Sequence, residues 1–502
     1  MSAWLRALPG ARSGVTRTLS SAIPGAPSLP ACDIEPQPYQ AGEYKEHLSA
    51  RRRHLPPRAL TYYRQPLLLH QGHMQWVWDH QHRRYLDFYG GIVTVSVGHC
   101  HPRVTEAARE QLGRLCHTTN IYLHPGIGEY TQRLCATLPS PLEVVFLVNS
   151  GSEANDLAML LARVHTQSNS FITLRGGYHG CSQASMALTS ISSWKFNVAP
   201  AATVHPTMCP DVYRGLWGGR HCRDSPVQTT RSCDCHSGEC RASEGYLGEL
   251  QDLLRCGVPC RLAAFIAEPI QGVGGVVQYP RGYLRAAAAA LIRERGGLFI
   301  SDEVERGFGR LGSHFWGFET HGVTPDIVTM AKGMGNGFPM GAVVTTPERE
   351  GGEIAASLRD GITFNTFGGS PLACAVGNSV LQVMEEEGLQ ARAETVGTEL
   401  LHQLADLRND FQAVGDVRGK GLMVGVDMVA SKESREPLPE AQMNQIWEDC
   451  REMGLLLGKG GLYGQTFRLK PPLCITREDV DFAVSVMRLA LHRHAASGPG
   501  PK

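Results

Sequence analysis

A single lysine, Lys332, follows the apolar run DIVTMA at residues 326–331 and precedes a stretch of glycines and methionines. Burying an unpaired ammonium group costs free energy, so a lysine at this point of the chain is expected to have a chemical task. An amine in a partly desolvated pocket loses its proton more easily than in water, and the neutral amine condenses with aldehydes. The alternative interpretation is a surface lysine that follows a strand.

The second candidate is Asp302, which follows the apolar letters GLFI within the run GLFISDEV. A carboxylate at the end of a strand can keep a proton on the nitrogen of a ring and so turn that ring into an electron sink. Alternatively, Asp302 caps the turn that follows the strand.

The motif NSGSEAND leads from an expected strand into an expected helix. The amides near Gly151 and Ser152 then have no partner within the helix and can bind a phosphate, with the hydroxyls of Ser150 and Ser152 as further donors. An ordinary helix N-cap accounts for the same letters.

In the motif GGYHG, Tyr178 follows another expected strand and can stack on a planar cofactor, although it can equally belong to the core. A strand-end carboxylate, a pocket lysine, a phosphate seat and a stacking aromatic ring are what a phosphorylated pyridine aldehyde requires of a protein. The four features together therefore indicate a site for such a cofactor.

The elements that must position these residues follow a clear pattern. A small antiparallel ribbon is expected from LLLHQGHMQWVWDHQHRRYLDFYGG, and short apolar strands alternate with helical stretches from about 100 to 345. That alternation predicts an α/β fold, with a mainly parallel sheet covered by helices on both faces and ligands at the carboxyl ends of its strands. From about 375 a smaller α+β region is expected, closed by a helix that starts at Thr476 with Asp479.

Length and composition narrow the function classes. A chain of 502 residues is long enough for two or three domains, and its 48 basic and 48 acidic residues balance, which gives no general field for nucleic acid or a membrane surface. The longest apolar runs fall short of the roughly 18 residues that cross a bilayer. Fifteen scattered cysteines are typical of reduced thiols. Small-molecule partners are therefore expected.

The first 32 residues contain three arginines and five serines, and no acidic residue precedes Asp33. This bias predicts a mitochondrial transit segment and a location in the matrix, with a disordered tail as the alternative. The expected organisation is a transit segment at 1–32, an N-terminal arm with part of a small domain at 33–99, a large domain at 100–374 and a C-terminal small domain at 375–502.

Eight blocks in the right order carry a family resemblance from about residue 60 to 495: YLDFYGGIVTVSVGHCHPRV, NSGSEAND, GGYHG, AEPIQGVGG, SDEV with GFGRLG, AKGMGNGFPMGA, TFGGSPLACA and FRLKPPL. The chain resembles the class III (ω-type) aminotransferases, which use pyridoxal phosphate. The resemblance implies the fold-type I architecture of such transferases: a large domain with a seven-stranded sheet between helices, and a smaller α+β domain built from both ends of the chain.

The resemblance also implies residue roles. Lys332 would form the internal Schiff base and carry the proton, Asp302 would pair with the pyridine nitrogen, and Thr366 would reach the phosphate of a neighbouring subunit in a homodimer or homotetramer. The implied cofactor contacts are Ser150, Gly151, Ser152, Tyr178, His179, Asp302, Val304, Glu305, Lys332 and Thr366.

For the substrate, the resemblance implies a movable glutamate, Glu268, paired with an arginine, Arg468, that binds carboxylates. The implied reaction moves an amino group from alanine, 3-aminoisobutyrate or related amino acids, methylated arginines included, to glyoxylate or pyruvate. The alternatives are an ornithine-type aminotransferase, an aminomutase or a decarboxylase of the same fold, and a catalytically silent metal-binding or interaction protein.

Two departures from the family pattern stand out. Glu305 and Arg306 replace the usual Gln-Thr pair, and an ionised Glu305 would repel the phenolate oxygen to which the family glutamine donates. Either Arg306 turns inward and neutralises Glu305, or Glu305 stays protonated. Turnover is expected to be slow relative to that of the Glu305→Gln variant. The second departure is Ser370, where Asn is usual.

An insertion that ends HCRDSPVQTTRSCDCHSGEC contains Cys222, Cys233, Cys235, His236 and Cys240. Such a cluster invites a zinc interpretation. Because the spacing lacks the usual C-x2-C pairs, we assign no metal ligands from the sequence.

Overall fold

The computed structural model of the chain describes residues 23–56, 61–233, 235–236, 240–347 and 354–498. The first 22 residues of the expected transit segment lie outside these ranges. None of the helices within them combines the length and the apolar character that crossing a bilayer requires.

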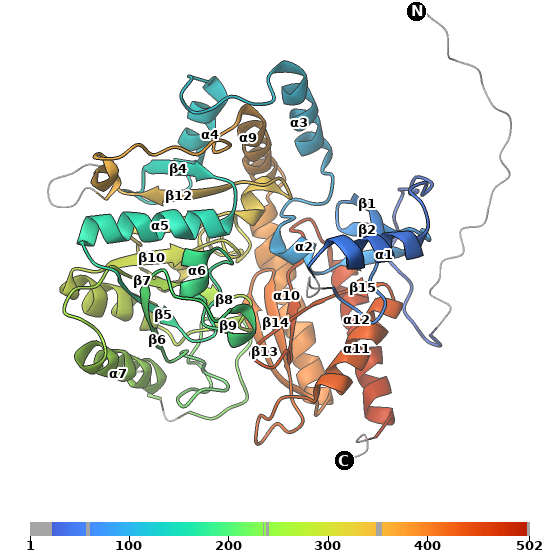
Figure 1. The fold of residues 1–502 in the computed structure, drawn as a ribbon. Coiled ribbons are helices and arrows are strands. Elements are labelled where there is room, and N and C mark those ends of the chain that lie inside the picture. The colour runs from blue at the N-terminus through green and yellow to red at the C-terminus, as the bar shows by residue number, and fades with distance from the viewer. Residues whose placement is uncertain (1–22, 57–60, 234, 237–239, 348–353, 499–502) are drawn as a thin grey trace, which may run out of the picture.

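A seven-stranded sheet forms the centre of the larger part of the molecule, in the order β4-β12-β11-β10-β7-β5-β6 (Figure 1). Its strand β12 is antiparallel to both neighbours, and the other neighbouring pairs are parallel, which confirms the mainly parallel sheet expected from the sequence. The strands are β4 (Val144–Val148), β5 (Ser170–Leu174), β6 (Thr203–Thr207), β7 (Ala264–Ala267), β10 (Leu298–Asp302), β11 (Ile327–Met330) and β12 (Gly341–Thr345).

Helices cover both faces of this sheet, and the strands are apolar on both sides as a result. In β7, Ile266 packs into the cluster that contains the inner face of α5 (Gly151–Thr166), whereas the adjacent Phe265 packs into the cluster that contains α7 (Arg241–Cys256). Successive side chains of a strand point to opposite faces, so one short apolar strand contributes side chains to the hydrophobic clusters on both faces of the sheet.

The other helices follow the sequence pattern. The stretch RAAAAALI is helical but irregular: a turn of α-helix at α8 (Tyr283–Ala286) continues as a π-helical turn at Ala287–Ile292. Thr476 caps the last helix and pairs with Asp479 in a capping box, as predicted. The remaining helices are α1 (Tyr44–His54), α2 (Gly90–Val93), α3 (Pro102–Arg114), α4 (Pro125–Cys135), α6 (Gln183–Leu188), α9 (Pro371–Glu386), α10 (Leu389–Asp410), α11 (Glu440–Glu452) and α12 (Arg477–Ala496).

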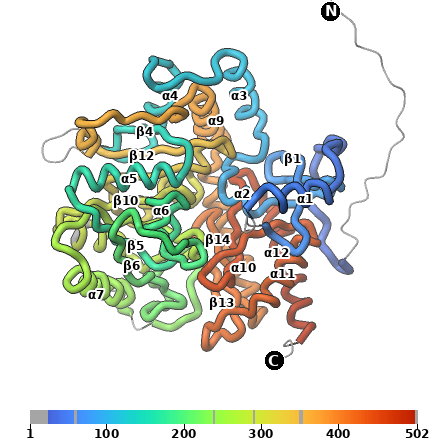
Figure 2. Tube along the Cα trace, in the orientation of Figure 1, coloured from blue at the N-terminus to red at the C-terminus, as the bar shows by residue number. Residues whose placement is uncertain are grey.

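The described N-terminal and C-terminal segments lie side by side in the smaller part of the molecule, blue against red in Figure 2. Strands β1, β2 and β3 form the expected antiparallel ribbon, and β15 completes it in parallel with β3, Leu455 beside Leu86. A second antiparallel sheet has the order β13-β14-β17-β16. These strands are β1 (Leu69–His73), β2 (Trp76–Asp79), β3 (Arg84–Asp87), β13 (Val414–Lys420), β14 (Met423–Met428), β15 (Leu455–Leu456), β16 (Gly458–Gly460) and β17 (Thr466–Leu469), and a separate pair is β8 (Ile270–Gln271) with β9 (Val277–Gln278).

We keep the division into 33–99, 100–374 and 375–502 as a proposal, with α9 running across the last boundary. Ser370 is the N-cap of α9, and its hydroxyl accepts a hydrogen bond from the amide of Ala373 at 3.3 Å. Serine and asparagine are equally good N-caps, so this departure from the family pattern preserves the start of the helix.

Candidate active site

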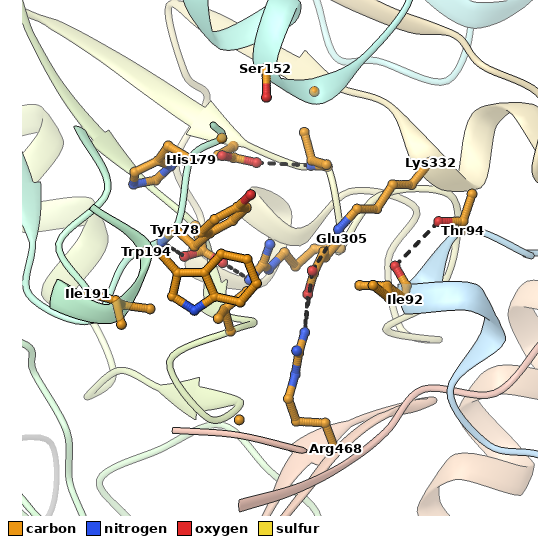
Figure 3. A pocket seen from close by; sticks show the side chains of 18 of the residues that line it. Ile92, Thr94, Ser152, Tyr178, His179, Ile191, Trp194, Glu305, Lys332 and Arg468 are labelled. Carbon is orange, nitrogen blue, oxygen red and sulfur yellow. Dashed lines mark hydrogen bonds and ion pairs between the residues drawn. The ribbon is translucent and has the colours of Figure 1, made fainter. Parts of the chain in front are cut away.

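A cavity of about 550 Å³ opens at the carboxyl ends of the central strands, within the size range of small-molecule sites. Figure 3 shows the side chains that line it. The predicted residues that line it are Ser150, Gly151, Ser152, Tyr178, His179, Glu268, Asp302, Val304, Glu305, Lys332 and Arg468. Thr366 is exposed and does not line the cavity of its own chain.

Lys332 follows β11 and has a φ of 48°, in the left-handed region that a lysine adopts only at a cost. A short 3-10 turn, Lys332–Gly335, starts here and is held by a 2.6 Å hydrogen bond from Ser96 to the carbonyl of Gly333. The strained backbone aims the amine into the cavity, where the side chain keeps 23% of its surface exposed. Lys332 is therefore a pocket lysine, and the surface interpretation is wrong.

Asp302 ends β10 and is a buried residue of the cavity wall. Its Oδ2 accepts hydrogen bonds from Nδ1 of His179 at 2.8 Å and from the amide of Asn155 at 2.9 Å. Burial alone would raise the pKa of Asp302, but the hydrogen bond and charge of His179 outweigh it and hold the pKa below its ordinary value. The site thus contains a carboxylate that stays charged although it is buried from solvent.

The start of α5 forms the opposite rim of the cavity. Ser150 caps the helix by accepting from the amide of Glu153 at 3.2 Å, and the hydroxyl of Ser152 accepts from the amide of Cys181 at 3.2 Å. Gly151 leaves little room for a side chain, because a Cβ would lie 3.0 Å from a methyl group of Val304. The first amides of a helix have no partner within it, so this crowded, dipole-positive end suits an anion.

Tyr178 is partly buried beside Trp194, with ring centroids 5.2 Å apart in an edge-on arrangement. Its backbone amide donates to Oε1 of Glu268 at 3.0 Å, which fixes the loop that carries the ring. Burial raises the pKa of Tyr178 to about 12, with nearby acidic groups adding to the shift, so the ring remains a neutral phenol.

These groups fit the cofactor expected from the sequence. Asp302 offers a fixed negative charge for a ring nitrogen, the start of α5 offers a seat for a phosphate, and Lys332 offers an amine for an aldehyde. Tyr178 offers an aromatic surface for the ring. All four face one cavity, as Figure 3 shows for the labelled Tyr178 and Lys332.

Glu305 occupies the middle of the site and is surrounded by cations. Its carboxylate lies 2.7 Å from Nζ of Lys332, 2.5 Å from Nζ of Lys470 and 3.0 Å from Nη2 of Arg468. Burial alone would raise the pKa of Glu305, but these three positive charges hold it well below its usual range. Glu305 is therefore ionised, and the interpretation that it stays protonated is wrong.

Lys470 is fully buried, and its position weakens its own charge. Burial and the adjacent guanidinium of Arg468 lower the pKa of Lys470 well below its ordinary value. The carboxylate of Glu305, 2.5 Å from Nζ of Lys470, acts in the opposite direction and favours the charged form of Lys470.

Arg306 does turn inward, but it neutralises another residue. Its guanidinium forms a buried ion pair with Glu268 and donates to the carbonyl of Ile270. Glu268 also accepts from the amide of Gly272 at 2.8 Å. In this structure the expected pair of Glu268 with Arg468 is therefore replaced by two pairs, Glu268 with Arg306 and Glu305 with Arg468. Both new partners come from the first departure, the replacement of the family Gln-Thr pair by Glu305 and Arg306.

The wall formed by α2 has an unusual backbone. Gly90, Gly91, Ile92 and Val93 all have φ values between 57° and 66°, a left-handed turn that costs roughly 1–2 kcal/mol for each residue with a side chain. At Gly90 a Cβ would also lie 3.0 Å from the carbonyl oxygen of Lys470. The turn places Ile92 in the cavity wall.

Asn155, Lys470 and Tyr89 are among the residues of the site that were not expected from the sequence. Asn155 lies one helical turn after Gly151, and that spacing could have indicated a shared face. Lys470 lies two residues after Arg468, and alternate residues of an extended chain share a side. Tyr89, whose hydroxyl accepts from Nη1 of Arg468 at 3.0 Å, had no comparable signal.

Comparisons with known proteins agree with this geometry. A family model described as aminotransferase class-III matches residues 61–491. The mitochondrial alanine–glyoxylate aminotransferase 2 of Pongo abelii is 56% identical over 469 residues, which cover 93% of this chain and 90% of that protein.

Two solved structures share the fold. A phospholyase from Arthrobacter in complex with phosphoethanolamine is 34% identical with a TM-score of 0.79, covering 90% of this chain and 100% of that one. An amine transaminase from an uncultivated Pseudomonas species in its pyridoxal-phosphate-bound form is 30% identical with a TM-score of 0.76, covering 88% of this chain and 96% of that one.

Proposed function

Because the chain belongs to the class-III aminotransferases, we propose that it transfers the amino group of alanine, 3-aminoisobutyrate or a related amino acid to glyoxylate or pyruvate. The chain is a pyridoxal-phosphate-dependent aminotransferase. The observation that carries the choice of substrates is the buried guanidinium of Arg468, which faces the same cavity as Lys332 and suits a small carboxylate. The name of the Pongo abelii relative supports alanine and glyoxylate; methylated arginines are further donors to test.

Residues of this chain would hold the cofactor as follows. The amides of Gly151 and Ser152 would bind the phosphate, Asp302 would keep the ring nitrogen protonated, and Lys332 would hold the aldehyde carbon. When bound, pyridoxal phosphate supplies an electron-withdrawing ring that takes up the electron pair left when the substrate α-carbon loses its proton.

Lys332 would act as the general base and acid of the reaction. Its Nζ would take the proton from the α-carbon of the amino donor and, in the second half of the reaction, return a proton to the α-carbon of the new amino acid. In the described structure this amine donates to Glu305 at 2.7 Å as one member of an ion pair, so it must give up a proton before it can act as a base. Asn155 and His179 would act as positioning residues, because they hold the charge and direction of Asp302.

Arg468 would bind the substrate carboxylate in competition with Glu305. The guanidinium is held on one side by Glu305 at 3.0 Å and on the other by the hydroxyl of Tyr89 at 3.0 Å. A substrate carboxylate must displace Glu305 to gain a two-point contact. This competition is our reason to expect weak binding of amino acids.

A homodimer or homotetramer is the proposed assembly. Phe364 and Phe367, which flank Thr366, are exposed, and so are Ile121 and Leu123 in the loop before α4. Exposed apolar groups of this number mark interaction surfaces. We propose that a second copy covers them and receives Thr366 near its phosphate seat.

The proposed location is the mitochondrial matrix. Two observations support it: the arginine- and serine-rich segment 1–32, and the similarity to the mitochondrial enzyme of Pongo abelii.

The test is a half-reaction of the holoenzyme with single amino acids. Alanine should change the visible absorption of the bound cofactor and release one pyruvate per site, detected by mass spectrometry. Lys332→Ala should abolish this release, whereas Lys45→Ala, a change on the exposed side of α1, should not. Failure of alanine and 3-aminoisobutyrate alongside a response to ornithine would refute the proposed substrates.

A further inference from the structure

A group of thiols lies far along the chain from the catalytic residues, in the insertion between β6 and α7. The Sγ atoms of Cys222, Cys233 and Cys235 all lie within 4.8 Å of one another. Those of Cys222 and Cys235 are 3.7 Å apart. Cys222 is buried and the other two are partly buried, so the thiols face one another rather than solvent.

A fourth thiol lies beside this group of three. Cys240 is the N-cap residue of α7, and its side chain is in hydrogen-bonding contact with both Cys222 and Cys235. His236, which the sequence places between two of the cysteines, is exposed, and we do not include it among the ligands.

The spacing of the sulfur atoms of Cys222, Cys233 and Cys235 is compatible with binding to one tetrahedral ion, with Cys240 as the neighbouring fourth thiol. In a zinc site with four thiolates the zinc–sulfur bonds are about 2.3 Å, which places neighbouring sulfur atoms about 3.8 Å apart. The 3.7 Å between Cys222 and Cys235 matches this value and is far longer than the roughly 2.05 Å of a disulfide. We propose that Cys222, Cys233, Cys235 and Cys240 bind one zinc ion.

The sequence did not reveal this site because its ligands come from three different segments. Cys222 follows a turn, Cys233 and Cys235 follow a strand-like return, and Cys240 starts a helix. The return is fixed by a 2.9 Å hydrogen bond from the amide of Arg220 to the carbonyl of Arg231. When the chain folds back and brings distant cysteines together in this way, a metal site can form without the C-x2-C pairs that are typical of zinc sites in a sequence.

A zinc ion here would stabilise an insertion that joins two parts of the molecule. Arg223, next to Cys222, is fully buried and binds Asp416 of β13 at 2.7 Å. Arg214, earlier in the insertion, binds Asp427 of β14. None of the four cysteines lines the catalytic cavity in the described part of the chain. The ion is therefore structural, and its loss should weaken the fold before it affects the bound cofactor.

Metal analysis of the purified holoenzyme tests the proposal. Inductively coupled plasma mass spectrometry should find close to one zinc per chain, and Cys235→Ser and Cys240→Ser should each lower this to about a tenth or less. The matched control is Cys260→Ser, an exposed cysteine outside the cluster, which should keep the full zinc content. Cofactor content, measured in the same samples, should be unchanged in all three variants.

Cobalt substitution keeps the test decisive if a variant fails to fold. Wild-type protein grown with cobalt should show the intense visible bands of tetrahedral thiolate coordination, at longer wavelength than the cofactor. Protein without zinc or cobalt, a disulfide between any of the four cysteines in mass spectra, or metal retained at full content in both variants would each overturn the proposal. None of these results bears on the aminotransferase reaction, so the two proposals fail separately.

Discussion

The replacement Glu305→Gln should strengthen the binding of amino acids. The buried ion pair between Glu305 and Arg468, 3.0 Å long, must open before a substrate carboxylate can take its place. A hydrogen bond between buried charged groups contributes about 1.5–3 kcal/mol, and about 1.4 kcal/mol corresponds to a tenfold change in affinity. Because the amide oxygen still accepts one hydrogen bond, we expect roughly a tenfold gain, the lower end of this range.

The same replacement should also destabilise the protein. Arg468, Lys332 and Lys470 lose their shared anion, and removing one partner of a buried ion pair costs about 3–5 kcal/mol. The variant should therefore bind substrate more tightly while unfolding at a lower concentration of urea.

The assay is stopped-flow absorption of the half-reaction over a range of alanine concentrations, which separates the apparent dissociation constant from the limiting rate. A primary amine without a carboxylate is the matched control, since it cannot use Arg468. Equal gains for alanine and for the amine would show that Glu305 acts through Lys332 alone. An unchanged dissociation constant for alanine would refute the reasoning that Glu305 blocks Arg468.

Two further predictions concern the same charges. Arg306→Thr should lower the free energy of unfolding by about 3 kcal/mol, because it leaves the buried Glu268 without its cation. The double variant with Glu305→Gln should lose less than the sum of the two single losses, since Glu268 and Arg468 can then pair. A double-mutant cycle, with unfolding in urea, measures the difference. The pKa of Glu305 is lower in the folded chain than in the unfolded one. Its ion pairs therefore stabilise the fold fully at a pH above the pKa in the unfolded chain, about 4.3, and this stabilisation is lost as the pH falls through the pKa in the folded chain. The difference in unfolding free energy between wild type and Glu305→Gln should accordingly stay constant from neutral pH to about 5 and narrow below about 4.3, as measured at fixed ionic strength.

The positions of the main catalytic candidates were predictable, because local pattern decides them. Asp302 and Lys332 each follow an apolar strand, and parallel strands bring their carboxyl ends to one edge of a sheet. The charge partners were not predictable in the same way. Arg306 reaches Glu268 across 38 residues, and Arg468 reaches Glu305 across 163, so the choice depends on side-chain directions that no local pattern encodes.

The fold shows the same division between local and distant information. The alternation of strands and helices predicted the parallel sheet, and the letters around Thr476 predicted a helix start. The antiparallel placement of β12 in that sheet and the addition of β15 to the N-terminal ribbon were not predicted. Both depend on pairing with strands far away in the sequence, and the thiol cluster of the insertion depends on a chain return in the same way.

The pairing of β3 with β15 also sets an order of events while the chain is being made. Leu86 leaves the ribosome long before Leu455, its neighbour in the finished sheet, and until then one strand has an open edge. Contacts between such distant segments form late in folding. A transcript that stops short of β15 would thus yield a chain with a bare hydrogen-bonding edge, a surface prone to aggregation, so premature termination should give insoluble material instead of a shortened enzyme.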